Sequence, residues 1–205
     1  TGSQKWCIQT GDFVISKPAI TSEGKIVFGS GDEFVYCASA DDGNIIWNTK
    51  LGGSVLSDPL TSEGRVFIGC VDRKIYCLNS ASGEIVWEYQ TDGLMRQRPI
   101  LENGILYAFV RDTYIWYAID ASTGQLIWRG NANTDESLFV CGDVRPVIAN
   151  GKLWCIDAQN TRPAYLSLDT GELAWTSTLE KVSSRGMTTN GSTVFYSSNS
   201  GRQIT

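Results

Sequence analysis

The sequence predicts an all-β protein built from repeated four-stranded antiparallel sheets, and three observations lead to that class. Tryptophans recur at steps of 41, 40, 41 and 47 residues, at Trp6, Trp47, Trp87, Trp128 and Trp175. Prolines recur at steps of 41, 40 and 47 residues, at Pro18, Pro59, Pro99 and Pro146. Short apolar stretches alternate with glycine-containing turns, and no stretch has the periodicity of a long amphipathic helix.

The first three strands of each repeat are recognised by their turns. The first strand is predicted to hold the proline, as in SDPL (57–60), and a turn glycine follows it, as at Gly64. The second strand is apolar, as in RVFIG (65–69). A polar turn then leads to the third strand, as in KIYCL (74–78). Glycine favours such turns because it adopts positive φ without strain.

The fourth strand follows a Thr-Gly or Ser-Gly turn and carries the tryptophan. Strict alternation along it places Ile85 with Trp87, and Leu126 with Trp128, on one face of the sheet. Four antiparallel strands in every ~40 residues are typical of a β-propeller blade. The predicted architecture is a single β-propeller domain, residues 1–205, with blades at about 11–48, 52–90, 93–130, 140–178, and 182–205 together with 1–10.

The stretch YAIDASTGQLIW (117–128) resembles the tryptophan-docking motif of quinoprotein-like (PQQ-like) propeller repeats, Ala-x-Asp-x-x-Thr-Gly-x-x-x-Trp. The match is complete at Ala118, Asp120, Thr123, Gly124 and Trp128. The resemblance implies that the indole of each repeat docks between neighbouring blades and is structural. The docking tryptophans are then Trp6, Trp47, Trp87, Trp128 and Trp175.

Other copies of the motif are partial. Cys37 and Cys77 stand in the alanine position of the copies that end at Trp47 and Trp87. The copy that ends at Trp175 is interpreted as one residue shorter than the others, because its Tyr165 is aligned with the tyrosine that begins the complete motif.

The two ends of the sequence fall in the same phase of the repeat. A strand at residues 5–9 could therefore complete the blade built by residues 182–205 and close a five-bladed ring. The alternative is a segment of a longer ring, since proteins that the chain resembles commonly have seven or eight blades. An unclosed segment would expose two apolar sheet faces.

Composition narrows the function classes. The formal net charge of −5 argues against nucleic acid as a partner. No apolar run approaches the ~18 residues of a transmembrane helix. The sequence has no histidine, which removes the commonest metal ligand and general base and makes a Cys/His zinc site impossible. No catalytic, cofactor-binding or metal-binding residue is predicted.

The six cysteines are Cys7, Cys37, Cys70, Cys77, Cys141 and Cys155. Most are expected to be free, buried thiols that pack as small hydrophobic groups, with disulfides as the alternative. Alcohol-oxidising quinoproteins that share this propeller commonly carry an adjacent cysteine pair beside their cofactor. This sequence has no such pair and no Cys-x-x-Cys, which argues against bound quinone, zinc and c-type haem.

Two sets of charged residues keep the period. Asp32, Asp72 and Asp112 are predicted to cap turn amides, with calcium as the weaker alternative. The residues before the proline position are Lys17, Asp58, Arg98, Arg145 and Arg185. If this strand lines a channel, the four cations form a ring that binds a carboxylate, a phosphate or an acidic segment of a partner. Pairing of each charge with a neighbour, such as Asp58 with Arg98, is the alternative.

The function hypothesis is a non-catalytic scaffold that binds another protein or an anionic ligand through one face, without a cofactor. Two longer connections, 131–143 and 157–165, are positions where specificity could reside. The alternatives are a PQQ-dependent dehydrogenase, with Trp116 or Trp154 stacking on the quinone, and an anion- or carbohydrate-binding propeller. The family resemblance favours the cell envelope, periplasmic or extracellular, whereas unpaired thiols favour a reducing compartment.

Overall fold

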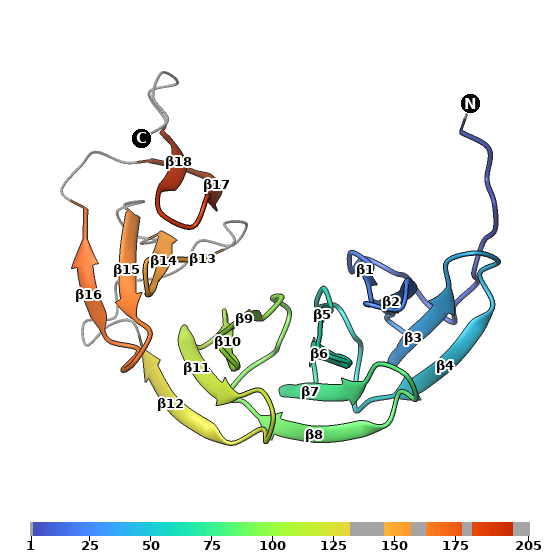
Figure 1. Cartoon of the computed structure of the whole chain (residues 1–205). Helices are drawn as coiled ribbons and strands as arrows, with labels where there is room; N and C mark the ends of the chain where they lie inside the picture. The colour runs from blue at the N-terminus through green and yellow to red at the C-terminus, as the bar shows by residue number, and fades with distance from the viewer. Residues whose placement is uncertain (1, 132–145, 157–162, 178–181, 199–205) are drawn as a thin grey trace. The chain divides into compact units, whose positions relative to one another are not determined.

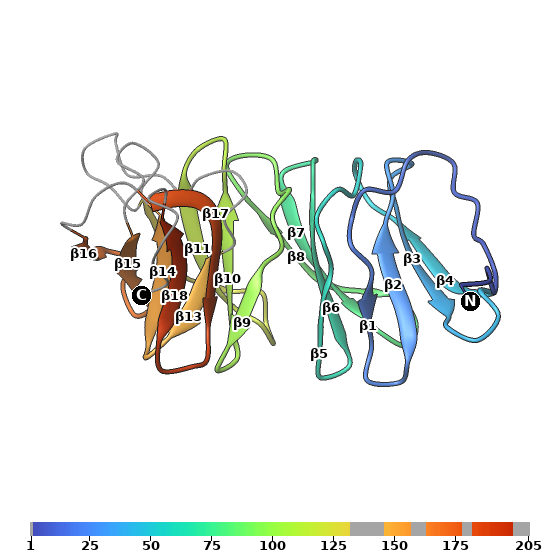
Figure 2. The same cartoon turned by 90° about the horizontal axis from the view of Figure 1, so that it is seen from above.

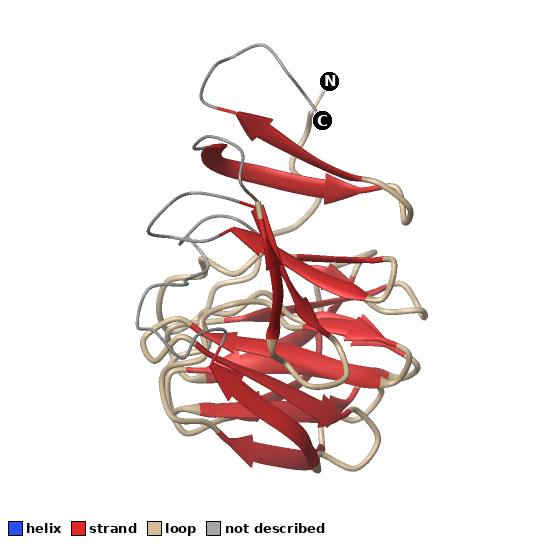
Figure 3. Cartoon of the chain, turned by 90° about the vertical axis from the view of Figure 1, so that its left-hand side faces the viewer, coloured by secondary structure: helices blue, strands red, loops and turns tan. Residues whose placement is uncertain are grey.

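The computed structural model describes residues 2–131, 146–156, 163–177 and 182–198 (Figure 1). These residues form strands and connecting turns without a helix, as Figure 3 shows. Consequently no described segment offers a helix with the length and apolar character needed to cross a membrane. The predicted all-β class of four-stranded antiparallel sheets is confirmed.

Sheets 1 and 2 have the same antiparallel order. Sheet 1 runs β1-β2-β3-β4 and consists of β1 (Ala19–Ile20), β2 (Lys25–Gly29), β3 (Phe34–Ser39) and β4 (Ile45–Lys50). Sheet 2 runs β5-β6-β7-β8 and consists of β5 (Leu60–Ser62), β6 (Arg65–Cys70), β7 (Lys74–Asn79) and β8 (Ile85–Gln90). Figure 2 shows them side by side, and β1 contacts β5. Each sheet is therefore a series of consecutive hairpins.

The remaining strands follow the same pattern. Sheet 3 has the order β12-β11-β10-β9 and consists of β9 (Ile100–Glu102), β10 (Ile105–Val110), β11 (Ile115–Asp120) and β12 (Leu126–Asn131). Sheet 4 has the order β13-β14-β15-β16 and consists of β13 (Val147–Ala149), β14 (Lys152–Ile156), β15 (Pro163–Ser167) and β16 (Leu173–Thr176). The fifth sheet is the hairpin of β17 (Val182–Thr189) and β18 (Val194–Ser198).

The chain divides into two compact units. The first comprises residues 1–113 and 120–125, and so holds sheets 1 and 2, the β9–β10 hairpin and the turn after β11. The second comprises residues 114–119 and 126–205, and holds the β11–β12 pair, sheet 4 and the β17–β18 hairpin. Within the second unit, β13 contacts β17.

The prolines lie just before the first strand of sheets 1 to 4. The prediction that each proline lies within that strand is therefore wrong by one residue. The strands begin at Ala19, Leu60, Ile100 and Val147, one residue after each proline. Proline has no amide hydrogen to donate to a neighbouring strand, so the ladder starts at the residue that follows it. The hairpin that follows β9 turns at Asn103 and Gly104, with φ of 50° and 76°. Two consecutive positive φ values match a two-residue hairpin turn.

The predicted common face for Ile85 and Trp87 is wrong. Trp87 pairs with Cys77, but Ile85 pairs with the adjacent Leu78, and the register shifts between these two pairs. This β-bulge places one extra residue in β8 and reverses the alternation. Trp87 is consequently buried while Ile85 is 44% exposed.

The same correction applies to Leu126 and Trp128. The ladder between β11 and β12 shifts register between Ala118 and Ile119, the partners of Trp128 and Leu126. Bulges at equivalent places in sheets 1 and 4 show that the irregularity belongs to the repeat. In sheets 1, 2 and 3 the tryptophan that follows the bulge contacts the next motif turn, and the aliphatic residue two positions before it is 40–44% exposed.

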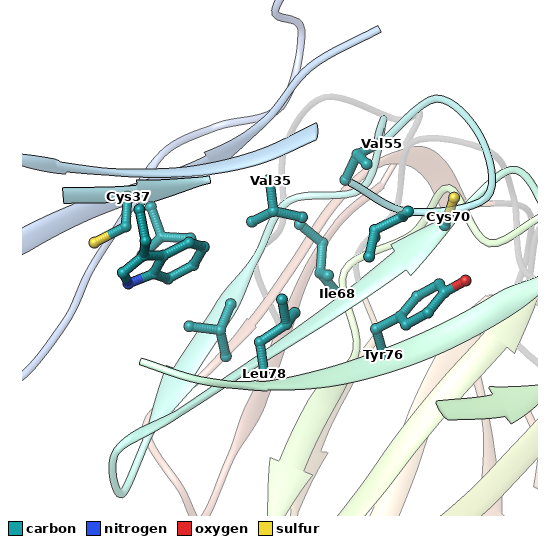
Figure 4. Close-up of a cluster of buried hydrophobic side chains, with 11 residues drawn as sticks. Val35, Cys37, Val55, Ile68, Cys70, Tyr76 and Leu78 are labelled. Atoms are coloured by element: carbon teal, nitrogen blue, oxygen red, sulfur yellow. The ribbon is translucent and has the colours of Figure 1, made fainter. Parts of the chain in front are cut away.

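The core of the first unit lies between sheets 1 and 2. Figure 4 shows Val35 and Cys37 on one side and Ile68 and Leu78 on the other, with Val55 of the segment that connects the sheets. All five side chains are fully buried. Neither sheet could bury these residues alone, so the stability of each sheet depends on its neighbour.

Residues 5–9 leave the predicted closure of the ring untested. They belong to no strand, because no described strand forms a ladder with them. The strands that would complete the fifth sheet would involve residues 199–205, which lie outside the described part of the chain.

Candidate functional site

Four tryptophans make the same contact with the following motif turn. The indole Nε1 donates a hydrogen bond to a backbone carbonyl oxygen, from Trp6 to Ala40 (3.0 Å), Trp47 to Ser80 (3.0 Å), Trp87 to Ala121 (3.0 Å) and Trp128 to Leu168 (2.7 Å). Each acceptor lies three residues before the motif glycine. The first three contacts lie within the first unit, and the fourth lies within the second. The indoles thus connect successive turns of the repeat.

The motif glycine provides the space for each ring. Gly83 has a φ of +77°, and a Cβ at this residue would lie 2.6 Å from Cε3 of Trp47. Equivalent positions at Gly43, Gly124 and Gly171 would bring a Cβ within 2.4–2.8 Å of an indole atom. Glycine is therefore required for two reasons. It adopts the left-handed backbone conformation without strain, and it has no side chain that would clash with the indole.

Trp175 differs from the other tryptophans. It is 42% exposed, and its ring stacks on Tyr165 with centroids 5.7 Å apart. Tyr165 also lies against Trp154, whose centroid is 5.0 Å away, and Lys152 Nζ lies 4.3 Å from the Tyr165 ring centroid. Trp175 is thus part of an aromatic cluster on sheet 4.

The ladder of sheet 4 corrects the alignment of this fourth motif copy. Tyr165 pairs with Trp175, as Ala118 pairs with Trp128 in the complete motif. Tyr165 therefore occupies the alanine position, Ser167 occupies the aspartate position, and the copy has full length. The prediction of a shorter copy is wrong, because the tyrosine resembled the residue that precedes the motif.

Asp120 organises the turn that receives Trp87. Its Oδ1 accepts hydrogen bonds from the amides of Ser122 (2.9 Å) and Thr123 (2.8 Å) and from both hydroxyl groups (2.6 and 2.9 Å). These bonds, led by that from the Ser122 hydroxyl, lower the pKa of Asp120 to about 2. In the equivalent turn Asn79 accepts hydrogen bonds from two amides, so a neutral side chain can serve the same capping role.

We expect Asp120→Asn to keep the turn but to remove its acid dependence. The folded-state pKa of Asp120 lies below its ordinary value of 3.8, so the ionised carboxylate stabilises the fold above about pH 4 and loses this effect toward pH 2. Thermal unfolding followed by circular dichroism should give a lower Tm for the variant at pH 7, and the difference should shrink as the pH approaches 2. A constant difference at every pH would contradict the prediction.

Asp32 and Asp72 make the local contacts expected of turn residues, and each also binds a tyrosine. Asp32 accepts hydrogen bonds from the Phe34 amide (3.1 Å) and the Tyr36 hydroxyl (2.7 Å), and Asp72 likewise from the Lys74 amide and the Tyr76 hydroxyl. These tyrosines were not among the predicted site residues. The signal was the spacing Asp-x-x-x-Tyr, which occurs in both repeats.

Asp32 also binds the backbone of the segment that precedes sheet 1, at Gly11. Its Oδ2 accepts a hydrogen bond of 2.7 Å from the Gly11 amide. Burial alone would raise the pKa of Asp32, but hydrogen bonds from Tyr36, Gly11, Ser30 and Phe34 outweigh it and lower the pKa. Burial and the bond to Asp32 in turn raise the pKa of Tyr36 to about 12. The pair is therefore an ionised carboxylate that accepts from a neutral phenol.

Two of the five charges before the proline position are cations whose side chains are described. Lys17 and Arg98 are both exposed in the first unit, and Asp58 between them is half-buried. The Lys17 amide donates a 2.7 Å hydrogen bond to Asp58 Oδ1. Arg145 lies outside the described residues, and Arg185 lies in β17, where its side chain is not described. The ring as a whole stays a prediction.

The described cysteines form no disulfide bond. Cys37, Cys70, Cys77 and Cys155 are buried, and Cys7 is exposed. Burial raises the pKa of Cys37 to about 11 and that of Cys70 to about 12, so both remain protonated at neutral pH. Cys141 lies outside the described residues.

Labelling with dithiobis(nitrobenzoate) at pH 8 should therefore separate the thiols by accessibility, because only a thiolate that the reagent can reach attacks its disulfide bond and releases thionitrobenzoate. Cys7→Ser should remove one rapidly reacting equivalent from the native protein. Cys37→Ala, which introduces the residue of the complete motif, should leave the rapid phase unchanged. A rapid phase that disappears in Cys37→Ala instead would contradict this assignment.

Of the two tryptophans considered for quinone stacking, Trp116 is buried and Trp154 is half-buried. Trp116 is 1% exposed, so neither ring face is open to a ligand. Trp154 packs against Tyr165 and, with a centroid distance of 5.9 Å, against Trp175. Within the described part of the chain, no three Cys, Asp or Glu side chains gather as a metal site would require.

Repeated four-stranded antiparallel sheets, with indoles docked on motif glycines, define a PQQ-like β-propeller repeat protein. A family model described as outer membrane protein assembly factor BamB matches residues 1–75 and 62–205. The chain therefore belongs to this family.

Two solved structures share the fold. BamB from Moraxella catarrhalis is similar with a TM-score of 0.73 and 24% identity, over 96% of this chain and 59% of that one. The computationally designed Ika8 protein is similar with a TM-score of 0.65 and 13% identity, over 88% of this chain and 54% of that one. The chain thus spans between half and three fifths of their lengths. A search of curated protein sequences found no match.

Proposed function

We propose that this chain is a non-catalytic propeller scaffold that binds another protein through one face. The observation that carries the proposal is the match of the BamB family model, which extends from residue 1 to residue 205 in two overlapping parts. Because that family is described as an outer membrane protein assembly factor, the proposed partner is a component of the outer-membrane assembly machinery. The proposed location is the cell envelope, on the periplasmic side.

The proposed function needs no cofactor. Its support is the absence of histidine and of an adjacent cysteine pair from the sequence, together with the burial of Trp116 in β11. A quinone-dependent dehydrogenase would need an open stacking surface and ligands for calcium. Neither PQQ nor calcium therefore has a place in the proposed function.

Binding to the purified outer-membrane assembly complex of Moraxella catarrhalis, prepared without its own BamB, tests the proposal. The immobilised chain should bind this complex saturably in biolayer interferometry, and the BamB of that organism should compete. In parallel, the chain should reduce no dye when PQQ, calcium and an alcohol or sugar are supplied. Dye reduction that depends on the quinone, without binding to the complex, would overturn the proposal.

A further inference from the structure

Three exposed cations gather before the first strands of the first unit, and here they are called the cationic edge: Lys17, Arg96 and Arg98. Hydrogen bonds between successive segments bring their repeats together. The Lys17 amide bonds Asp58 Oδ1 at 2.7 Å, and the Ser57 hydroxyl bonds the Gln97 carbonyl at 3.1 Å. Lys17, Asp58 and Arg98 therefore occupy equivalent positions on three consecutive segments.

The charges of the cationic edge are not neutralised by described residues. The four ion pairs among these residues use Lys5, Lys25, Lys50 and Lys74, and none includes Lys17, Arg96 or Arg98. The expected pairing of Asp58 with Arg98 is absent from these ion pairs. Asp58 accepts a hydrogen bond from the Lys17 amide, and the side chains of Lys17 and Arg98 are exposed.

We infer that the cationic edge binds an acidic segment of the protein partner. The chain has a formal net charge of −5, so three exposed cations beside the single carboxylate of Asp58 form a locally positive surface that attracts carboxylates. A guanidinium group binds a carboxylate through two parallel hydrogen bonds, and an ammonium group adds a flexible third contact. Lys17 lies on the first of three consecutive segments and Arg96 and Arg98 lie on the third, so an acidic segment that crosses all three would contact every cation.

This inference rests on the proposed function for the existence of a protein partner and adds the chemistry of the contact. The carboxylate of Asp58 lies between the cations along the chain of repeats and repels an incoming acidic side chain. The affinity should therefore rise when this single negative charge is removed, a sign that a purely structural role would not produce.

A fluorescein-labelled hexaglutamate peptide measures the contact by anisotropy, with a hexalysine peptide and a short DNA duplex as comparison ligands. The double variant Lys17→Gln/Arg98→Gln should bind hexaglutamate about tenfold more weakly, since each charge-assisted bond contributes a substantial part of such affinity. The matched control Lys5→Gln/Lys50→Gln removes the same total charge from exposed positions elsewhere and should bind nearly as the wild type. Asp58→Asn keeps an acceptor for the Lys17 amide and should bind more tightly.

The outcomes separate this inference from the proposed function. Equal losses in both double variants, or tighter binding of the DNA duplex than of hexaglutamate, would overturn the acidic-segment contact. The same variants are then tested against the assembly complex. If the complex binds wild type and Lys17→Gln/Arg98→Gln equally, the inference fails and the scaffold function stands. If the complex binds neither while hexaglutamate binding follows the expected order, the scaffold function fails and the acidic-segment site stands.

Discussion

Trp47→Ala should destabilise the first unit by about 3–5 kcal/mol, the range for removal of a large buried aromatic side chain. The Trp47 side chain is 8% exposed and packs in the core between sheets 1 and 2. Its removal also leaves the Ser80 carbonyl without the hydrogen bond from Nε1. Urea unfolding followed by fluorescence and circular dichroism should show an earlier midpoint with loss of sheet structure.

Trp175→Ala provides the comparison within the same chain. Because Trp175 is 42% exposed and contacts mainly Tyr165 and Trp154, its removal should cost less than half as much as removal of Trp47. Equal losses would show that the docked position of the indole contributes little and that the aromatic area alone matters.

Gly83→Ala should cost about 2–5 kcal/mol for a single added methyl group. The left-handed backbone at φ +77° costs an alanine roughly 1–2 kcal/mol. The new Cβ would also lie 2.6 Å from Trp47 Cε3 and 2.8 Å from Thr49 Oγ1, and such overpacking adds about 1–3 kcal/mol. Denaturant midpoints of the purified variants measure the sum.

Gly64→Ala isolates the backbone contribution. Gly64 has a φ of +73°, but a Cβ there would meet no atom within 4 Å. This variant should lose only the roughly 1–2 kcal/mol of the left-handed conformation. The difference between the destabilisation of Gly83→Ala and that of Gly64→Ala measures the cost of the steric clash between the new methyl group and the side chains beside Gly83.

A double variant tests whether the two effects share one contact. In Trp47→Ala/Gly83→Ala the methyl group no longer meets the ring, so Gly83→Ala should cost about as much as Gly64→Ala. Additive losses would argue that Gly83 and Trp47 act separately. A large coupling energy between Trp47 and Gly83 would show that the indole and the glycine turn on which it docks act as one inter-sheet contact.

These contacts bear on function because a repeat protein is stabilised mainly by its nearest neighbours. Docked indoles hold successive segments in fixed register, and that register brings Lys17, Asp58 and Arg98 to equivalent places. Loss of a docking tryptophan should therefore weaken partner binding indirectly, with a change in unfolding midpoint. Loss of Arg98 should weaken binding without such a change.

Most of the fold could be predicted from the sequence because tryptophan, proline and glycine recur at a nearly constant spacing. The spacing of Trp47, Trp87 and Trp128 identified the period, and the turn glycines identified the hairpins. The complete motif at residues 118–128 identified the family to which the chain belongs. These features depend on local chemistry: positive φ at glycine, the missing amide hydrogen of proline and the size of the indole. Local chemistry of this kind can be predicted from the residue types alone.

The tertiary structure alone decided where each indole and each charge lies. The bulge opposite Cys77 and Leu78 reversed the face of Ile85, and pairing with Trp175 moved Tyr165 into the alanine position. The backbone carbonyl of Ser80 accepts the hydrogen bond from Trp47 Nε1, and the sequence could not single it out because every residue has a backbone carbonyl. The hydrogen bond from the Lys17 amide to Asp58 likewise depends on how the segments pack. Such choices depend on hydrogen-bond register and on neighbours some 40 residues away, and no local pattern in the sequence records them.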